Sequence, residues 1–226
     1  MHVRTAADFR RRLREGPPLV LDAAMGTDLL ARGVPLPAPL WSAQALVDAP
    51  DLVEAIHREN AEAGANVLTI ASFRLHGRNL RGSSCSLSQR ALLSLAVDTA
   101  RRATKTGISS KGEERAQQGR PAGRPSEPFT PPSKKIFDSP WIAGSLAPLE
   151  DCYRPDRVPS EAEISSEHAE MAAALAAAGV DLVLVETMNT VREALAAARG
   201  AAQMTRSVDS GPSAAKARAR AASGGA

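Results

Sequence analysis

The feature that most constrains this chain is a segment type that occurs twice: the end of an alanine-containing helix, a glycine, and a run of branched apolar residues. It reads "AEAGANVLTI" around Gly64 and "ALAAAGVDLVLVE" around Gly179. Glycine at this place can take the left-handed conformation that ends a helix, and Val/Leu/Ile-rich runs are typical of strands buried on both faces. Helices alternating with such strands predict an α/β fold with a parallel sheet and right-handed crossovers.

The same order extends to four β/α units. We expect strands at residues 19–21, 65–73, 141–146 and 179–188, and helices at residues 5–15, 27–32, 50–63, 86–103, 160–178 and 190–202. Units of this kind build an open doubly wound sheet or a closed (β/α)8 barrel, and a complete barrel typically needs about 250 residues. Four units therefore predict, if a barrel, an incomplete one.

Two polar segments, residues 104–135 and 203–226, do not fit this pattern. Both are rich in small, polar and basic residues and lack apolar periodicity, so we expect them to be disordered. The predicted organisation is one domain at residues 1–202, interrupted by an insert at 104–135 and followed by a tail at 203–226.

The basic charge of the chain lies mainly in these segments. The formal net charge is +3, but Arg101 to Lys135 carries nine basic and three acidic residues, and Gln203 to Ala226 carries four basic and one acidic. The remaining residues carry a net charge of about −6. A segment-restricted charge of this kind is weak support for a nucleic-acid partner, and we predict none.

Cysteine content and hydropathy indicate a cytoplasmic setting. Cys85 and Cys152 are the only cysteines, and they have neither the number of a disulfide framework nor a CxxC spacing. No apolar run approaches the roughly 18 residues of a membrane span, and the Arg-rich N-terminal segment has no apolar signal core. We therefore expect a cytoplasmic location and no membrane association.

The candidate chemistry lies where the predicted strands end. Parallel α/β folds bind ligands at the carboxyl ends of their strands, where this sequence places Asp22, Ser72, Gly144-Ser145 and Glu186-Thr187. An Asp and a Glu at the same end of a sheet could hold an ammonium group, bind a hard cation, or act as an acid/base pair.

Each of these residues also has an ordinary structural explanation. Strand-end acids often cap the next helix or pair with an arginine. Ser72 has no His/Asp partner placed by the sequence, so a turn or cap role is more usual than nucleophilic catalysis. His57 and His168 fall at helical positions that we expect to be exposed, and His76 falls in a loop.

Five ordered blocks resemble the N-terminal half of the homocysteine S-methyltransferase family. They are "LDAAMGTDLLARGV", "LWSAQAL", "HRENAEAGANVLTIASFRLH", "WIAGSLAPLEDCYRP" and "GVDLVLVETMNTVREALAAA". The resemblance implies a (β/α)8 TIM barrel that binds homocysteine at the strand ends and holds its sulfur on zinc. Zinc keeps a thiol deprotonated at neutral pH, so that the thiolate can attack a small methyl donor and give methionine.

The resemblance also implies roles for individual residues. Asp22 and Glu186 match acids that hold the amino-acid end of homocysteine. The family usually has Asn-Thr-Phe at strand two, and this chain has Ala71-Ser72-Phe73, so the hydroxyl is kept on Ser72 and the amide is lost. The usual Asp-Gly of the first turn is Asp22-Ala23, which would crowd a main-chain contact to the substrate.

The family's zinc thiolates lie in the second half of the barrel, one near strand six and a Cys-Cys pair near strand eight. Cys85 and Cys152 lie outside those motifs, so we expect no metal ligands here. The predicted substrate-binding residues are Asp22, Ser72 and Glu186, with methyl transfer as the family activity and an inactive isolated chain. The alternative is a non-catalytic partial barrel that associates with a partner, or with itself, through open sheet edges. The methyl donor is not determined by this part of the sequence.

Overall fold

The chain folds as helices around a short parallel sheet. The computed structural model describes residues 5–105 and 139–210. Within these ranges the sheet has the order β1-β2-β3, formed by β1 (Val67–Ile70), β2 (Trp141–Leu146) and β3 (Leu182–Val185). The helices are α1 (Ala6–Glu15), α2 (Met25–Ala31), η1 (Trp41–Gln44), α3 (Ala45–Asp48), α4 (Pro50–Glu62), α5 (Gly77–Arg81), α6 (Gln89–Lys105), η2 (Pro155–Arg157), α8 (Glu161–Ala178) and α9 (Val191–Ser210). The predicted α/β class and parallel sheet are confirmed.

The helix ends follow local sequence signals. Ser160 caps α8 and its side chain exchanges hydrogen bonds with Glu163, the third residue of the helix, in a capping box. Gly179 ends α8 at φ 86°, and Gly64 follows α4 at φ 101°. Both angles lie in the left-handed region that glycine adopts at little cost. The repeated glycine therefore separates helix from strand in both places, as predicted.

The first predicted strand differs from expectation. Residues 19–21 were expected to form a buried strand, but only Leu21 pairs, through a single parallel bridge to Val67. Val20 and Leu21 are 52% and 53% exposed. The sheet thus has a bridge where a fourth strand was expected, and the prediction of a buried strand was wrong.

Side chains replace part of the ladder at this bridge. The Val20 N–H donates to the side-chain oxygen of Asn66 at 3.0 Å, and the Thr69 N–H donates to Oδ2 of Asp22 at 2.8 Å. In a regular parallel ladder the Thr69 N–H would reach the main-chain carbonyl of Asp22. The side-chain carboxylate of Asp22 therefore accepts this hydrogen bond in place of the main-chain carbonyl of Asp22, and regular pairing stops at this residue.

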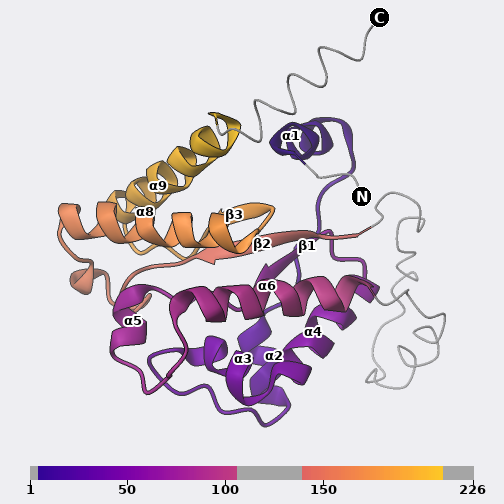
Figure 1. Ribbon diagram of the computed structural model, residues 1–226, viewed down its shortest axis with the longest axis horizontal. Coiled ribbons are helices and arrows are strands. Elements are labelled where there is room, and N and C mark those ends of the chain that lie inside the picture. Colours follow the sequence, from indigo (N-terminus) through magenta and orange to yellow (C-terminus); the bar gives the residue numbers. More distant parts are fainter. Residues whose placement is uncertain (1–4, 106–138, 211–226) are drawn as a thin grey trace, which may run out of the picture.

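Helices α4, α6, α8 and α9 pack side by side in chain order. In Figure 1 these helices follow one another along the strands, from α4 and α6 to α8 and α9. The core cluster that they share with β1, β2 and β3 places them on one face of the sheet. Close packing depends on small residues. A Cβ on Gly144 of β2 would lie 2.5 Å from Cδ2 of Leu175, and a Cβ on Gly200 of α9 would lie 3.1 Å from the main chain of Ala169.

The other face of the sheet is apolar where the strands begin. Alternate strand residues share a face, and a cluster forms there from Val67, Trp141, Ala143, Leu182, Leu184 and Phe9. The Phe9 ring of α1 meets the Trp141 ring edge-on at a centroid distance of 5.2 Å. In Figure 1, α1 lies apart from the other helices, beside the end of the sheet where β2 begins. The polar residues of this face are therefore confined to the opposite end.

The two polar segments begin later than predicted. Helix α6 continues through Lys105, and α9 continues past Ala202 to Ser210. The disorder expected for residues 106–135 and 211–226 concerns residues outside those described. Among the helices at 5–105 and 139–210, none is long and apolar enough to cross a membrane.

Candidate functional site

Three of the predicted strand-end residues are joined by hydrogen bonds. The Ser145 hydroxyl at the end of β2 donates to Oε1 of Glu186 at 2.5 Å. The Ser72 hydroxyl accepts from the Ser145 N–H at 2.9 Å and donates to the Ser145 carbonyl at 3.2 Å. A continuous polar line therefore runs across the ends of β1, β2 and β3.

Asp22 lies at the same end of the sheet. Its carboxylate is half-buried and accepts the Thr69 N–H. Burial raises the pKa of Asp22 above its ordinary 3.8; hydrogen bonds from Thr69 oppose the rise, and the negative charge of Glu186 adds to it. Asp22 therefore lies within the electrostatic influence of Glu186, and a cation near its carboxylate would favour its ionised form.

The backbone after Glu186 is unusual. Thr187 has φ 58°, in the left-handed region that a β-branched residue rarely adopts. Its hydroxyl lies 3.5 Å from Oε2 of Glu186, the outer limit of a hydrogen bond. Costly backbone conformations of this kind cluster at functional sites. Glu186 thus has Oε1 in a short hydrogen bond, whereas Oε2 has only the weak contact with Thr187.

Two of the alternatives considered for these acids have no support among the described residues. Among the described residues, neither Asp22 nor Glu186 forms an ion pair with a Lys, Arg or His side chain, so the arginine-paired alternative has no support. Those residues also contain no group of three or more His, Cys, Asp or Glu side chains able to hold a metal ion. The two carboxylates could accept charge-assisted hydrogen bonds from a primary ammonium group.

The hydroxyl that reaches Glu186 belongs to Ser145, and the Ser72 hydroxyl contacts the Ser145 main chain instead. Ser72 is fully buried, and its hydroxyl bonds both main-chain groups of Ser145. Ser145, only 1% exposed, is the serine that reaches Glu186. The sequence indicates Ser145 through its position in "IAGSL", near the end of the strand and on the same face as Ala143.

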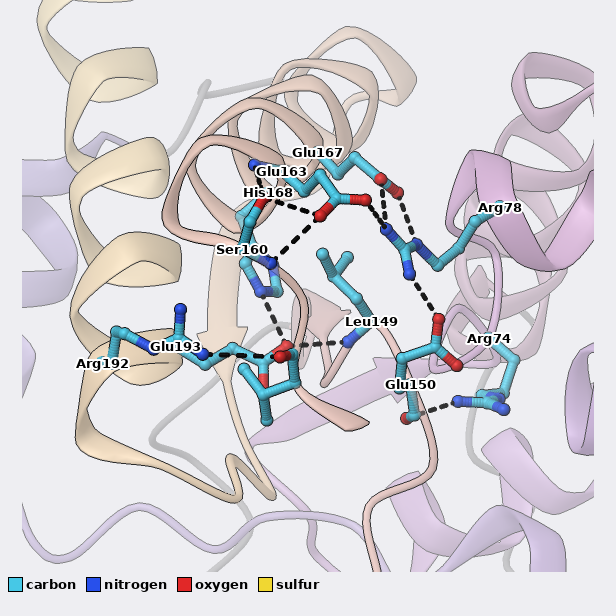
Figure 2. Close-up of polar contacts among 11 residues, drawn as sticks. Arg74, Arg78, Leu149, Glu150, Ser160, Glu163, Glu167, His168, Arg192 and Glu193 are labelled. Atoms are coloured by element: carbon cyan, nitrogen blue, oxygen red, sulfur yellow. Dashed lines mark hydrogen bonds and ion pairs between the residues drawn. The ribbon is translucent and has the colours of Figure 1, made fainter. Parts of the chain in front are cut away.

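A second polar cluster lies beside the site, where the chain leaves β2. Oε1 of Glu193 accepts the Leu149 N–H at 2.9 Å and lies 3.3 Å from Nε2 of His168. Burial would raise the pKa of Glu193, but the hydrogen bonds from His168 and Leu149 together lower it. Figure 2 shows these groups converging from α8, α9 and the loop after β2. His168 has no exposed surface, so the prediction that it is exposed was wrong.

Arg78 ties the same loop to α8. Figure 2 shows its guanidinium between Glu150 of the loop and Glu163 and Glu167 of the helix. The bidentate contact with Glu167 measures 2.6 and 2.9 Å. These three contacts of Arg78 hold the loop that follows Ser145 against α8. Arg78 therefore has a structural role.

The other two histidines of the described residues, His57 and His76, are also buried. His57 of α4 has no exposed surface, and neither ring nitrogen has a hydrogen-bond partner among the described residues. Its expected exposure was wrong. His76 lies 2.9 Å from the Ala147 carbonyl. Burial lowers the pKa of each to about 4, so both rings are neutral at physiological pH.

The cysteines do not fit a zinc site. Cys85 and Cys152 are half-buried free thiols in separate loops, and neither belongs to a cluster of metal ligands among the described residues. Burial and the neighbouring Asp151 raise the pKa of Cys152, which disfavours the thiolate that zinc binds. The described residues therefore do not supply the donor set that zinc needs.

Comparison with known proteins identifies relatives of this chain. The family model for homocysteine S-methyltransferase matches residues 19–218. "Homocysteine S-methyltransferase 4" of Zea mays is 29% identical over 201 residues, covering 84% of this chain and 53% of that protein. "Homocysteine S-methyltransferase YbgG" of Bacillus subtilis is 31% identical over 191 residues, covering 81% of this chain and 54% of that protein. The chain thus spans about half the length of these relatives.

A solved structure shows the same similarity. The crystal structure of the homocysteine methyltransferase MmuM from Escherichia coli in its metallated form aligns with a TM-score of 0.64 and 29% sequence identity. The alignment covers 88% of this chain and 63% of that one. The fold of the described residues therefore matches the corresponding part of a longer protein.

Proposed function

The chain belongs to the homocysteine S-methyltransferase family, and we propose that its strand ends form the part of a substrate pocket that holds the amino group of homocysteine. The observation that carries the proposal is the pairing of Asp22 with Glu186 at one end of the sheet, each without a cationic side-chain partner among the described residues. An ammonium group between them would offset a repulsion that the free protein retains.

The named residues have distinct roles in this proposal. Asp22 and Glu186 contact the ammonium group directly. Ser72 contributes through Ser145, whose peptide it bonds on both sides. The sheet that carries them is proposed to be four β/α units of a (β/α)8 barrel. The two free thiols are the reason for proposing the cytoplasm as its compartment.

The reaction proposed for the completed pocket is transfer of a methyl group from a small donor to the homocysteine sulfur, giving methionine. The thiol must lose its proton before it becomes an effective nucleophile. Bound zinc would supply that ionisation in the family's chemistry, but the described residues do not fit zinc. We therefore propose that the isolated chain binds homocysteine without methylating it.

Calorimetric titration of the full 226-residue chain with homocysteine tests the binding proposal. We expect binding that Asp22→Asn and Glu186→Gln each weaken about tenfold or more, because each removes a charge-assisted hydrogen bond. The matched control is Glu170→Gln, which alters an exposed acid of α8. No binding by the unaltered chain would reject the proposal, and methionine formation with added zinc and a methyl donor would reject the inactivity.

A second candidate is a non-catalytic protein that associates through open sheet edges. The exposure of the strands favours it: all six residues of β2 are buried, whereas all four of β3 are only half-buried. Beyond the other side of β1, Val20 and Leu21 are about half exposed, and on α9 Val191 is 76% exposed. Unpaired edges flanked by apolar side chains favour association.

Light scattering coupled to size-exclusion chromatography separates the two candidates. Association through the edges predicts a mass that rises with concentration, and Val191→Asp should reduce it. Leu87→Asp, at an exposed residue between α5 and α6, serves as the control. A monodisperse monomer that unfolds cooperatively would count against the second candidate and leave the binding proposal unaffected.

A further inference from the structure

The hydroxyl of Ser145 is buried at the centre of the sheet end and is directed at one acid. Ser145 and Leu184 are partners in the parallel register, and Glu186 follows Leu184 by two residues on the same face. The 2.5 Å contact from the Ser145 hydroxyl to Oε1 of Glu186 is of the length expected for a hydroxyl donating to a carboxylate. A rotation of Glu186 away from β2 would break this bond.

Ser72 fixes Ser145 in turn. The hydroxyl of Ser72 bonds both the N–H and the carbonyl of Ser145, and Ser72 has no exposed surface. One side chain therefore holds the peptide groups on either side of the Ser145 Cα atom. The backbone from which the Ser145 side chain projects is therefore held by Ser72, whose hydroxyl has no other hydrogen-bond partner among the described residues.

Glu186 is held at its backbone as well. Thr187 turns the chain immediately after it with φ 58°, a conformation that persists in a β-branched residue only where the surroundings enforce it. The contact from the Thr187 hydroxyl to Oε2 is 3.5 Å, too long to occupy that oxygen strongly. Glu186 is thus fixed through Oε1 and keeps Oε2 for another donor.

We propose that Ser145 is a positioning residue that orients Glu186 toward the ammonium group of an amino-acid ligand, and that Ser72 acts through Ser145. The inference rests on the proposed binding function. The proposal gives Ser72 and Ser145 a role in recognising the amino group. It gives them no role in the chemistry of the thiol, because the hydrogen bonds of their side chains lead only to Glu186.

The test compares two ligands that differ only at the amino group: homocysteine and its desamino analogue 4-mercaptobutanoate. Dissociation constants are measured by calorimetry for the full chain and its variants. We expect Ser145→Ala to weaken homocysteine binding about tenfold and to leave 4-mercaptobutanoate nearly unchanged, since one charge-assisted hydrogen bond is lost. Ser145→Thr, which keeps the hydroxyl, should retain the discrimination.

Two further variants separate positioning from a general loss of structure. Ser145→Ala in a Glu186→Gln background should have no additional effect on the ratio of the two dissociation constants. Ser166→Ala is the matched control, because Ser166 donates to Glu170 at 3.0 Å in an exposed Ser–Glu pair on α8. If Ser145→Ala destabilises the fold, Ser72→Ala provides a second variant with the same expected direction.

The outcomes distinguish this inference from the proposed function. Homocysteine binding by the unaltered chain together with an unchanged ratio in Ser145→Ala and Ser72→Ala overturns the positioning role and leaves the binding proposal standing. Equal weakening of both ligands assigns the serines to structure and also overturns the positioning role. Absence of homocysteine binding by the unaltered chain overturns both.

Discussion

Burial raises the pKa of Asp22, and the negative charge of Glu186 adds to the rise although β1 and β2 lie between the segments that carry the two acids. The effect reaches across the sheet because both side chains lie at its carboxyl end. Fold stability alone does not require a second acid at this end of the sheet, since the charge of Glu186 disfavours the ionised form of Asp22. An energetic cost of this kind is typical of a site that awaits a ligand.

Asp22→Asn should stabilise the free protein while abolishing much of its homocysteine binding. The folded-state pKa of Asp22 lies above its ordinary 3.8, so the native state binds more protons than the unfolded chain and stability falls as pH rises through that pKa. An amide keeps an acceptor for the Thr69 N–H without the charge. At pH 7 we expect a gain of about 1 kcal/mol in urea unfolding, the size common for substitutions at functional sites.

The pH dependence provides the control for that variant. The stability difference between Asp22→Asn and the unaltered chain should be largest at neutral pH and should disappear below 3.8, where the carboxyl is protonated in both states. A loss of stability at pH 7 would mean that the Thr69 contact needs the charge, and it would contradict the idea of an energetically costly acid.

Glu186→Gln should lower the pKa of Asp22. The substitution removes a negative charge and keeps an oxygen for the Ser145 hydroxyl, so the geometry is retained. Because burial, and not Glu186, is the largest cause of the raised pKa of Asp22, we expect a small fall. Carboxyl carbon NMR titration measures this directly, with Glu170→Gln as the distant control. An unchanged Asp22 titration would show that the two acids are not coupled.

Much of the fold could be predicted because its signals are local. The Ser160 capping box, the glycine at 179 and the apolar run at 141–146 each act over a few residues. β2 has the expected bounds, and α8 begins one residue later than expected because Ser160 is its N-cap. The first strand failed because its apolar pattern does not reveal that the side chains of Asn66 and Asp22 replace ladder bonds. Helix α5 was missed because five residues carry too little periodicity to be detected.

The site was predictable in position and less so in its connections. The two acids could be placed because strand ends of parallel sheets meet at one edge. The direction of the Ser72 hydroxyl could not, since it depends on a register between β1 and β2 that no local signal sets. The burial of His168 depends on Glu193, a contact between helices that sequence periodicity does not specify.

Gly200→Ala should destabilise the protein, against the usual direction for a helix. Alanine in place of glycine normally stabilises a helix interior by about 1 kcal/mol. At this position the new Cβ would lie 3.1 Å from Cα and N of Ala169, which are main-chain atoms of α8 that cannot move aside alone. We expect a net loss of about 1–3 kcal/mol in urea unfolding, typical of overpacking. Ala198→Gly, at an exposed position of α9, measures helix propensity without the contact, and a stabilised Gly200→Ala protein would show that α8 and α9 are not closely packed.

His57→Leu should make the stability of the fold less sensitive to acid, because it removes one group that takes up a proton on unfolding. Burial lowers the pKa of His57 from 6.5 to about 4, so between these values the unfolded chain binds a proton that the native state does not. Stability therefore falls as pH drops through this window, by about 1.4 kcal/mol per pH unit and about 3 kcal/mol in total for this residue. Leucine fits the apolar surroundings of α4 and has no such charge, so urea unfolding from pH 7 to pH 4 should show a shallower decline than in the unaltered chain. Because the pKa of His76 is also lowered to about 4, the stability of the variant should still decrease with falling pH, and this remaining decrease serves as an internal reference. Parallel stability profiles for the two proteins would show that the His57 ring can be protonated within the fold.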